Sequence, residues 1–259
     1  MTDRNDLAFW FERLKATGVN VPRTTIVRAT GSVAEAAYGE YSPHVAPLIE
    51  DLKRAAADIG YPVFLRTGHG SGKHGWKDTC FVERPEDFGT HVPNLIEWSE
   101  CVSMPFGLPT DVWVVREFLP LVSMFKAFHG RMPINREFRA FIEGGEVRCL
   151  HAYWPAFALK GQSPSKSNWS ELLTEMNKLL VGDDALIRTQ SALVSCAFDG
   201  AWSLDWAQTQ DGTWYAIDMA VAEESFHWPG CPKSDQKEPP SEEEREAMAG
   251  ALLVAKGPT

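Results

Sequence analysis

The sequence predicts an α+β fold in which antiparallel strand pairs alternate with helices, arranged as two small lobes with a cleft between them. Apolar residues recur at spacings of three and four in several segments, which is typical of amphipathic helices. Two strand pairs turn at Gly-Gly or Asp-Gly. The chain has 259 residues, 44% of them hydrophobic, which is enough to bury a core in one large domain or two lobes.

Amphipathic spacing predicts five helices before the C-terminal tail. In the first, Leu7, Trp10, Phe11 and Leu14 share one face, and Gly18 ends the helix. The expected helices cover residues 6–17, 48–59, 85–100, 171–181 and 185–198.

Runs of β-branched and aromatic residues predict the strands. Single strands are expected within residues 19–29, 63–67, 79–82 and 111–121. Hairpins are expected over residues 138–154, turning at Gly144-Gly145, and over residues 202–220, turning at Asp211-Gly212. The polar segment 159–169 is expected to be a loop.

These elements predict three regions. Residues 1–60 form a short N-terminal α/β region, residues 61–232 a core, and residues 233–259 a polar, mobile tail with a short final helix. Within the core, we expect a lobe of residues 61–115 with a glycine-rich loop and a lobe of residues 116–232 with carboxylates.

Charge and cysteine content exclude several classes of protein. A net charge of −10 argues against general binding of nucleic acids or membrane surfaces, although one nucleotide could still bind. The five cysteines are scattered and lack C-x-x-C spacing, so the sequence indicates neither a disulfide framework nor a zinc site. With no signal peptide and no apolar run of about 18 residues, we expect a soluble, cytoplasmic protein.

A loop rich in glycine and lysine follows the strand at residues 63–67. Glycines let backbone amides approach a ligand, and cationic side chains attract an anion, so a phosphate is the first candidate ligand. The cations are Arg66, Lys73 and Lys77, and the glycines are Gly68, Gly70, Gly72 and Gly75. A solvated hairpin tip is the alternative interpretation.

Known phosphate loops fit this segment poorly. A P-loop fails because Thr67 stands at its first glycine and His74 at its Ser/Thr position. The pattern G-x-G-x-x-G is present but leads into a strand instead of a helix. A glycine flap between two strands covers the ATP phosphates in protein kinases, but the H-R-D and D-F-G signatures are absent here.

The hairpin at residues 202–220 combines carboxylates with apolar strands. Alternation along the strand predicts that Asp218 shares a face with Ala216 and Ala220. A carboxylate on a half-buried strand is costly unless it is paired or bound to a cation, and Mg²⁺ held with ATP phosphates would satisfy it. Alternatively, Asp205 and Asp218 form salt bridges with arginines.

Two further segments carry candidate ligand-binding residues. Arg139 lies on one strand face with Glu137, where it could clamp a phosphate or neutralise a neighbouring carboxylate. Glu117, Phe118 and Leu119 end a strand and could form an adenine slot, although core packing explains the two apolar residues equally well.

The histidines give weaker signals, because none shows the i, i+4 spacing of a helical zinc pair. His227 and Cys231 closely follow the carboxylate strand and could line the acceptor side of a site. A nucleophilic Cys231 also stays open, without a partner base that the sequence identifies.

The order of these elements resembles that of the ATP-grasp superfamily over about residues 61–228. One arginine and two lysines, Arg66, Lys73 and Lys77, are similar to the set that names a virus- and bacteria-associated clade, which includes phage proteins. A more distant similarity is to the eukaryotic ATP-grasp chaperone that assembles a translation initiation factor.

The resemblance implies an ATP cleft between two α+β lobes with antiparallel sheets. Phosphates would lie against Arg66, Arg139 and the loop that contains Gly70, Gly72, Lys73 and Lys77, with Arg139 and Lys77 in catalytic roles. Adenine and ribose would lie against Glu117, Phe118 and Leu119. Asp205 and Asp218 would hold Mg²⁺. Ala220 stands where most members have an asparagine that also binds metal, so either Glu223 or Glu224 replaces that ligand or one metal site is weakened, together with catalysis.

The implied function is an ATP- and Mg²⁺-dependent ligase that converts a carboxylate into an acyl phosphate, which an amine then attacks. The short region before residue 61 favours a large acceptor such as a protein or peptide. Two alternatives are an ATP-binding assembly or interaction protein without ligase turnover, and a phosphotransferase acting on a hydroxyl.

Overall fold

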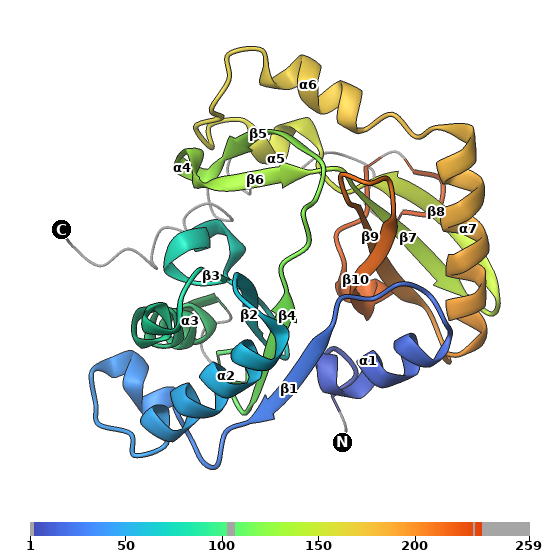
Figure 1. Cartoon of the computed structure of the whole chain (residues 1–259). Helices are drawn as coiled ribbons and strands as arrows, with labels where there is room; N and C mark the ends of the chain where they lie inside the picture. The colour runs from blue at the N-terminus through green and yellow to red at the C-terminus, as the bar shows by residue number, and fades with distance from the viewer. Residues whose placement is uncertain (1–2, 103–106, 230, 235–259) are drawn as a thin grey trace. The chain divides into compact units, whose positions relative to one another are not determined.

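The structure is a computed structural model of the chain and describes residues 3–102, 107–229 and 231–234 (Figure 1). Within these residues the chain forms two compact units. We call residues 23–118 the glycine-loop unit and residues 3–22 together with 119–234 the carboxylate unit. Most of the predicted tail, residues 235–259 with the expected final helix, lies outside the described residues.

The glycine-loop unit is built on an antiparallel sheet. The strands follow the order β1 (Thr24–Arg28), β4 (Val112–Glu117), β2 (Val63–Thr67) and β3 (Phe81–Val82). Since β1 pairs with β4 over its whole length, residues 23–60 share this sheet with the glycine loop. The expected boundary after residue 60 therefore lies inside this unit, between α2 (Val45–Ile59) and β2.

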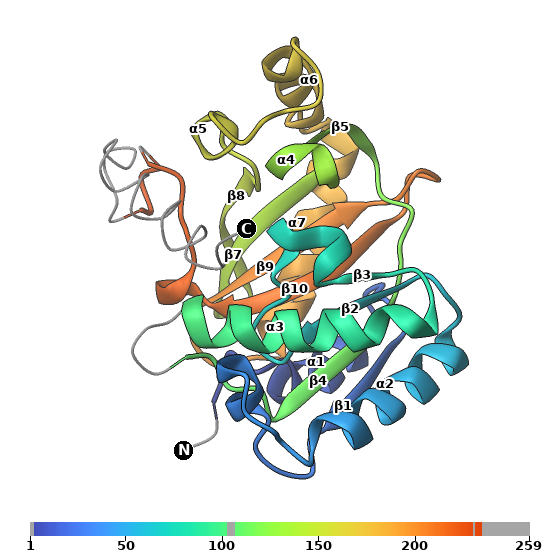
Figure 2. The ribbon, with the colours of Figure 1, turned by 90° about the vertical axis from the view of Figure 1, so that its left-hand side faces the viewer.

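Two helices cover one face of this sheet, α2 and α3 (Phe88–Val102), which lie side by side in Figure 2. Alternate strand residues such as Leu65 and Val115 are fully buried against Leu52 of α2 and Leu95 of α3. Because strand side chains alternate, the opposite face carries Arg66 and Arg116. Short 3₁₀ turns complete the unit: η1 (Ala34–Tyr38), η2 (Lys73–Asp78) and η3 (Pro85–Asp87).

The carboxylate unit contains a second antiparallel sheet. Its order is β10 (Trp214–Val221), β9 (Trp202–Gln208), β7 (Glu137–Glu143) and β8 (Glu146–Ala152). Both predicted hairpins are confirmed, including their turns between Glu143 and Glu146 and between Gln208 and Trp214. The sheet of β5 (Ser123–Ala127) and β6 (Met132–Asn135), the short helices α4 (Phe128–Arg131) and α5 (Ala156–Leu159), and η4 (Ala222–Glu224) were not predicted.

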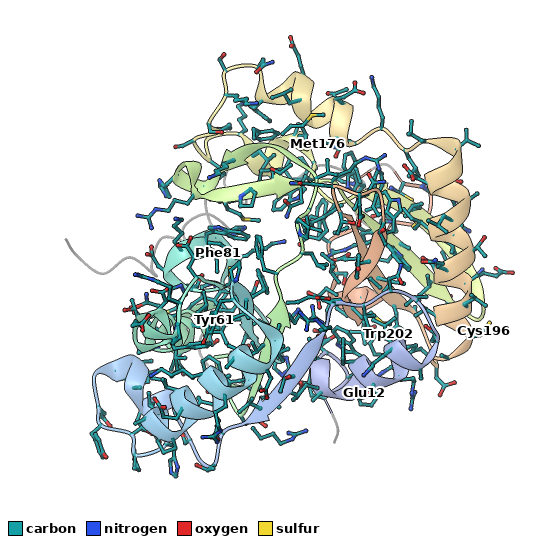
Figure 3. All side chains as sticks on the ribbon, viewed as in Figure 1. Glu12, Tyr61, Phe81, Met176, Cys196 and Trp202 are labelled. Carbon is teal, nitrogen blue, oxygen red and sulfur yellow. The ribbon has the colours of Figure 1, made fainter. Side chains whose placement is uncertain are left out.

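Helices α1 (Leu7–Ala16) and α7 (Val181–Cys196) pack on the apolar face of this sheet. Phe9 of α1 stacks on Trp202, which is labelled in Figure 3, with ring centroids 6.2 Å apart. Ser191 of α7 accepts a hydrogen bond of 2.9 Å from the indole Nε1 of Trp206. Trp202, Leu204 and Trp206 alternate along β9, so they direct their side chains to this face, and Ser203, Asp205 and Ala207 share the other.

Helix boundaries differ from the prediction in the C-terminal half. The helices at residues 171–181 and 185–198 are instead α6 (Trp169–Met176) and α7, which begins at Val181. Asp183 and Asp184 lie in the first turn of α7, where carboxylates interact favourably with the N-terminal end of the helix dipole. The expected strand at residues 79–82 is limited to Phe81 and Val82.

A bulge in β10 corrects the predicted face of Asp218. Ala216 lies opposite Trp206 and Asp218 lies opposite Asp205, so Ile217 is an extra residue between these two pairs. Asp218 therefore shares its face with Ala220, as predicted, but not with Ala216. Strict alternation of side chains fails here because the strand contains one additional residue between Ala216 and Asp218.

None of the helices in the described parts of the chain is long and apolar enough to cross a membrane.

Ser191→Ala should destabilise the carboxylate unit by about 1–3 kcal/mol, because it leaves the buried indole N–H of Trp206 without its acceptor. Urea unfolding followed by tryptophan fluorescence measures this change. Thr189→Ala removes an exposed hydroxyl from the same helix and should change stability by less than about 0.5 kcal/mol. Equal midpoints for the two variants would contradict the assigned role of Ser191.

Candidate functional site

Three of the predicted metal and phosphate residues of the carboxylate unit, Asp205, Asp218 and Arg139, lie in one row across its sheet. Asp218 of β10 is opposite Asp205 of β9, and Asp205 is opposite Arg139 of β7. Arg139 is in turn opposite His151 of β8. Directly opposite residues project from the same face of an antiparallel sheet, so four strands contribute one side chain each to a polar row.

Arg139 and Asp205 form a bidentate ion pair at the centre of this row. Nε of Arg139 lies 2.7 Å from one carboxylate oxygen and Nη2 lies 2.8 Å from the other. The Arg139 guanidinium also lies 4.8 Å above the ring of Tyr153, and its Nη1 donates to the carbonyl oxygen of Phe226 at 3.3 Å. The pairing of Arg139 with a neighbouring carboxylate, one of the two roles considered from the sequence, is present.

Burial and charge act in opposite directions on the guanidinium. Burial disfavours the charged form of Arg139, but the facing Asp205 carboxylate outweighs it and raises the pKa of Arg139 above its ordinary value. Asp218 contributes to the same effect from the next strand. The row therefore places two carboxylates, Asp205 and Asp218, beside a single arginine on one face of the sheet.

The position two residues after Asp218 has no oxygen-bearing side chain. Ala220 lies opposite Ser203, whose hydroxyl is 2.6 Å from the hydroxyl of Ser225. Glu223 is exposed and lies in η4 beyond the end of β10, and Glu224 accepts a hydrogen bond from Asn5. The metal-binding role of Glu223 stays a prediction.

The glycine loop of the other unit joins two paired strands, as predicted, because β2 and β3 pair at Val63–Val82 and Phe64–Phe81. It is tightly packed. The Thr67 hydroxyl accepts the backbone N–H of Gly70 at 3.1 Å, and the Thr79 hydroxyl donates to the carbonyl of Gly72 at 2.7 Å. A Cβ at Gly70 would approach Trp98 of α3 to 2.4 Å, so only glycine fits there.

Trp76 anchors the far side of this loop. Its ring stacks on Phe81 with centroids 5.5 Å apart and contacts Phe118 edge-on at 6.2 Å. Trp76 adopts φ of +41°, a region costly for a side chain of this size, and these ring contacts hold it there. The solvated hairpin tip considered from the sequence therefore does not describe most of this loop.

The three cations of the loop differ in exposure. Arg66 is only 5% exposed, and its Nε donates to the carbonyl oxygen of Thr67 at 3.0 Å. Lys73 is half-buried at the start of η2, whereas Lys77 is exposed and lies 3.5 Å from Glu83. Phosphate binding by these residues, and the catalytic role of Lys77, stay predictions.

Glu117 is held by an arginine at the start of the same sheet. Its carboxylate accepts from the backbone N–H of Arg23 at 2.7 Å and from Arg23 Nε at 3.0 Å. Phe118, the last residue of the glycine-loop unit, contacts the ring of Phe81 at 4.8 Å. Both apolar residues, Phe118 and Leu119, are half-buried, and adenine binding by this segment stays a prediction.

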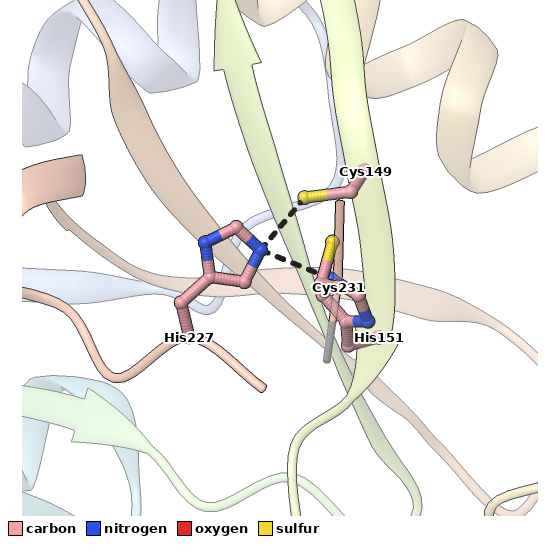
Figure 4. Close-up of side chains that lie close together, drawn as sticks. All are labelled: Cys149, His151, His227 and Cys231. Atoms are coloured by element: carbon pink, nitrogen blue, oxygen red, sulfur yellow. Dashed lines mark hydrogen bonds between the residues drawn. The ribbon is translucent and has the colours of Figure 1, made fainter. Parts of the chain in front are cut away.

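A second cluster was not predicted. Cys149 and His151 of β8 lie beside His227 and Cys231 from the segment after η4, and their ligand atoms all lie within 4.8 Å of one another (Figure 4). Its residues show neither C-x-x-C spacing nor a helical histidine pair, the two patterns that indicate a zinc site most directly. The available signals were Cys-x-His on a strand and His followed four residues later by Cys.

Two titratable groups of this cluster are shifted from their ordinary pKa. Burial, together with the neighbouring Cys231, raises the pKa of the Cys149 thiol. Burial, the main cause, and the nearby His227, a smaller one, lower the pKa of His151 to about 4, so its imidazole is neutral at physiological pH.

Two α+β units with antiparallel sheets, one with a glycine loop between paired strands and one with a carboxylate row, are typical of the ATP-grasp class. A family model for the ATP-grasp domain, family 3 of the clade named for one arginine and two lysines, matches residues 56–228. The match covers more than half of the chain, and the chain belongs to this family. The predicted superfamily and α+β class are confirmed.

Three solved structures illustrate what the chain is similar to. C-terminally truncated Cdc123 from Schizosaccharomyces pombe is similar with a TM-score of 0.52 and 12% identity, over 85% of this chain and 86% of that chain. A RimK domain ATP-grasp protein from Sphaerobacter thermophilus is similar with a TM-score of 0.45 and 14% identity, over 83% of this chain and 57% of that chain. D-alanine–D-alanine ligase from Bacillus anthracis, complexed with ATP, is similar with a TM-score of 0.46 and 9% identity, over 84% of this chain and 53% of that chain.

This chain therefore spans 57% and 53% of the latter two proteins. The similarity to truncated Cdc123, with a TM-score of 0.52, shows a common fold and does not extend to substrate. No curated protein sequence matches the chain.

Lowering the pH from about 6.5 to about 4 should destabilise the glycine-loop unit through His74. Burial, with Lys73 as a second cause, lowers the pKa of His74 to about 4. As the pH falls, the His74 imidazole therefore binds a proton in the unfolded chain before it does so in the folded chain. The free energy of unfolding decreases between about pH 6.5 and about pH 4 by at most about 3 kcal/mol. Urea unfolding at a series of pH values measures the slope.

His74→Gln should remove this part of the pH dependence, because glutamine does not titrate. His129→Asn, at an exposed histidine of the carboxylate unit, should keep the slope of the unchanged protein. A His74→Gln variant with an unchanged slope would show that His74 is accessible to protons in the folded state.

Proposed function

We propose that this chain is an ATP- and Mg²⁺-dependent ligase that forms an acyl phosphate from a carboxylate, which an amine then attacks. The observation that carries the proposal is the row of Asp218, Asp205 and Arg139 in register on one face of the sheet. Membership of the ATP-grasp family supports the use of ATP.

The donor set of the row fits Mg²⁺. Asp205 and Asp218 supply hard carboxylate oxygens, which this ion prefers. Arg139 occupies one lone pair on each Asp205 oxygen, and an ionised carboxylate offers about four such positions. When bound there, Mg²⁺ would offset negative charge on the phosphates of the nucleotide.

The remaining side chains bind and orient the reactants. The planar guanidinium of Arg139 is fixed by Asp205, so it presents its outer N–H groups in a defined direction to a phosphoryl oxygen. Arg66, with Lys73 and Lys77, would neutralise the other phosphate oxygens, and Gly70 and Gly72 would allow close approach of backbone amides. Glu117, Phe118 and Leu119 would contact adenine and ribose.

The acceptor belongs to the same proposal. A protein or peptide is the favoured carboxylate or amine substrate, and general nucleic-acid binding is not expected with a net charge of −10. The scattered cysteines support a reducing, cytoplasmic location. Association with phages is proposed from the clade resemblance alone.

A second candidate function is an ATP-binding assembly or interaction protein without ligation. Ala220 favours it, since no side-chain oxygen stands at this position of the metal strand, and the adjacent Ser203 hydroxyl is already paired with Ser225. A weakened second metal position would preserve nucleotide binding more than phosphoryl transfer. A phosphotransferase would share the ADP product and would be separated by identifying the phosphorylated or ligated product.

The ligase proposal predicts ADP and phosphate as products when ATP, Mg²⁺ and a panel of peptide carboxylates and amines are supplied. Asp218→Asn should abolish this release and weaken Mg²⁺-dependent ATP binding at least about tenfold, because a neutral amide holds the cation poorly. Coupled ADP detection and titration calorimetry with and without Mg²⁺ measure the two effects.

Asp58→Asn, at an exposed carboxylate of α2, should behave as the unchanged protein in both assays. Release of AMP and pyrophosphate would contradict the ligase. ATP binding without turnover on the whole panel would favour the assembly protein. Unchanged Mg²⁺-dependent affinity in Asp218→Asn would refute the metal assignment.

The two loop lysines should contribute unequally to ATP affinity. Lys73→Ala should weaken binding more than Lys77→Ala, because Lys73 is half-buried, whereas Lys77 is exposed and its charge is screened by solvent. Calorimetry gives the affinities, and thermal unfolding checks that both variants fold. Lys53→Ala on α2, which also removes a lysine paired with a glutamate, is the matched control. Wild-type affinity in both loop variants would exclude the loop from nucleotide binding.

A further inference from the structure

The Cys-His cluster lies on the edge strand of the carboxylate sheet and is separate in chemistry from the carboxylate row. His227 Nε2 is 3.2 Å from His151 Nε2 and 3.1 Å from Cys149 Sγ (Figure 4). Cys231 Sγ completes a group whose ligand atoms lie within 4.8 Å of one another. Two thiols and two imidazoles thus converge on one point, although the ligase chemistry proposed above uses none of them.

We propose that Cys149, His151, His227 and Cys231 bind a structural Zn²⁺ ion. A Cys₂His₂ set is a standard zinc donor set, and tetrahedral binding at ordinary zinc distances separates two nitrogens by about 3.3 Å and two sulfurs by about 3.8 Å. The nitrogen separation of 3.2 Å already matches. The largest separation, 4.8 Å, needs a contraction of about 1 Å, which side-chain rotation supplies.

The strand fixes one half of the site. Cys149 and His151 are two residues apart on β8, so both project from the face that carries Arg139. Phe141, opposite Cys149 on β7, stacks on the His227 ring with centroids 4.0 Å apart and an interplanar angle of 16°. This stacking sets the plane of the imidazole, so little rotational freedom is lost when a metal binds.

The segment after η4 supplies the other half and is held against β8 by its own contacts. Trp228 Nε1 donates to the carbonyl oxygen of Ala152 at 2.7 Å, and Arg139 Nη1 binds the carbonyl of Phe226 on the other side of His227. His227 is therefore fixed between two anchored residues.

Cys231 lies in a turn suited to a thiolate. Its backbone N–H donates to the carbonyl of Trp228 at 3.3 Å, and the backbone N–H of Lys233 points to its Sγ at 3.5 Å. A backbone donor to sulfur stabilises the anionic form that binds metal. Loading would release two thiol protons to solvent and leave Zn²⁺ balanced by two thiolates, with both histidines neutral.

Four protein ligands fill a tetrahedral shell, so this ion would be structural and would not activate a water molecule. It would join the segment that follows the carboxylate strand β10 to the edge strand β8. Because His151 lies directly opposite Arg139 in the sheet, a metal bound to His151 would restrict movement of the strand beside Arg139. The same link would protect the exposed edge of β8.

Two other chemistries of these residues make different predictions. A Cys149–Cys231 disulfide would use both sulfurs and give the imidazoles no role. A nucleophilic Cys231 activated by His227 would need one thiol and one imidazole. The convergence of all four groups favours the metal over either.

The test uses the full chain, produced without a histidine tag in zinc-supplemented medium. Elemental mass spectrometry should find about one Zn²⁺ per chain, and replacement by Co²⁺ should give the visible absorption of tetrahedral cobalt together with thiolate charge-transfer bands. Cys149→Ser and Cys231→Ser should each reduce bound zinc below about 0.2 per chain. Cys196→Ser, at an exposed free cysteine, should retain it.

Measurements on the unchanged protein keep the proposal falsifiable even where a variant fails to fold. Absence of zinc together with absence of a cobalt spectrum would overturn it, as would an intact mass two hydrogens lower with no metal, which indicates the disulfide. If both Cys149→Ser and Cys231→Ser retain zinc, the ion binds at another site and the proposal is wrong. Loss of zinc without loss of ATP binding separates this site from the proposed nucleotide site.

Discussion

The ion pair between Arg139 and Asp205 is the interaction on which the carboxylate unit depends. It joins the two central strands of the sheet, β7 and β9, on the face away from α1 and α7. A buried pair of this kind is costly to dehydrate, so it persists only where both groups are well bonded, and Tyr153 and Phe226 complete the bonding of the guanidinium. The same pair orients the guanidinium of Arg139 and buries Asp205, whereas Asp218 on the next strand is half-buried.

The two faces of this sheet divide stability from chemistry. One face is a tryptophan-rich core, with Trp202, Trp206 and Trp214 fully or almost fully buried, and it packs on helices that hold it rigid. The opposite face carries charged and metal-competent side chains at alternate positions of the same strands. A rigid support lets a polar row keep its geometry, because the strands beneath it cannot shift without disrupting the core.

The glycine loop is also held in place by packed side chains. Thr67 and Thr79 bind the loop backbone, Trp76 is held among aromatic rings, and Gly70 lies directly on Trp98. A loop fixed at so many points is pre-organised, so a ligand that binds it loses less conformational entropy than it would on a free flap. The carboxylate row and half of the Cys-His cluster, Cys149 and His151, are built from strand residues, so strand register positions both.

Alternation and turn residues in the sequence alone determined the α+β class, both hairpins of the carboxylate sheet and the residue types expected at a nucleotide site. Composition cannot reveal strand register. The additional residue Ile217 reverses the alternation in β10, so Ala216 projects from the face opposite to that of Asp218. Only the tertiary structure decided that Arg139 pairs with Asp205 and that His227 and Cys231 meet Cys149 and His151, residues 76 positions or more away in the chain. The first contact depends on the pairing of β7 with β9, and the second depends on how the segment after η4 packs against β8. Local spacing in a sequence does not encode either arrangement.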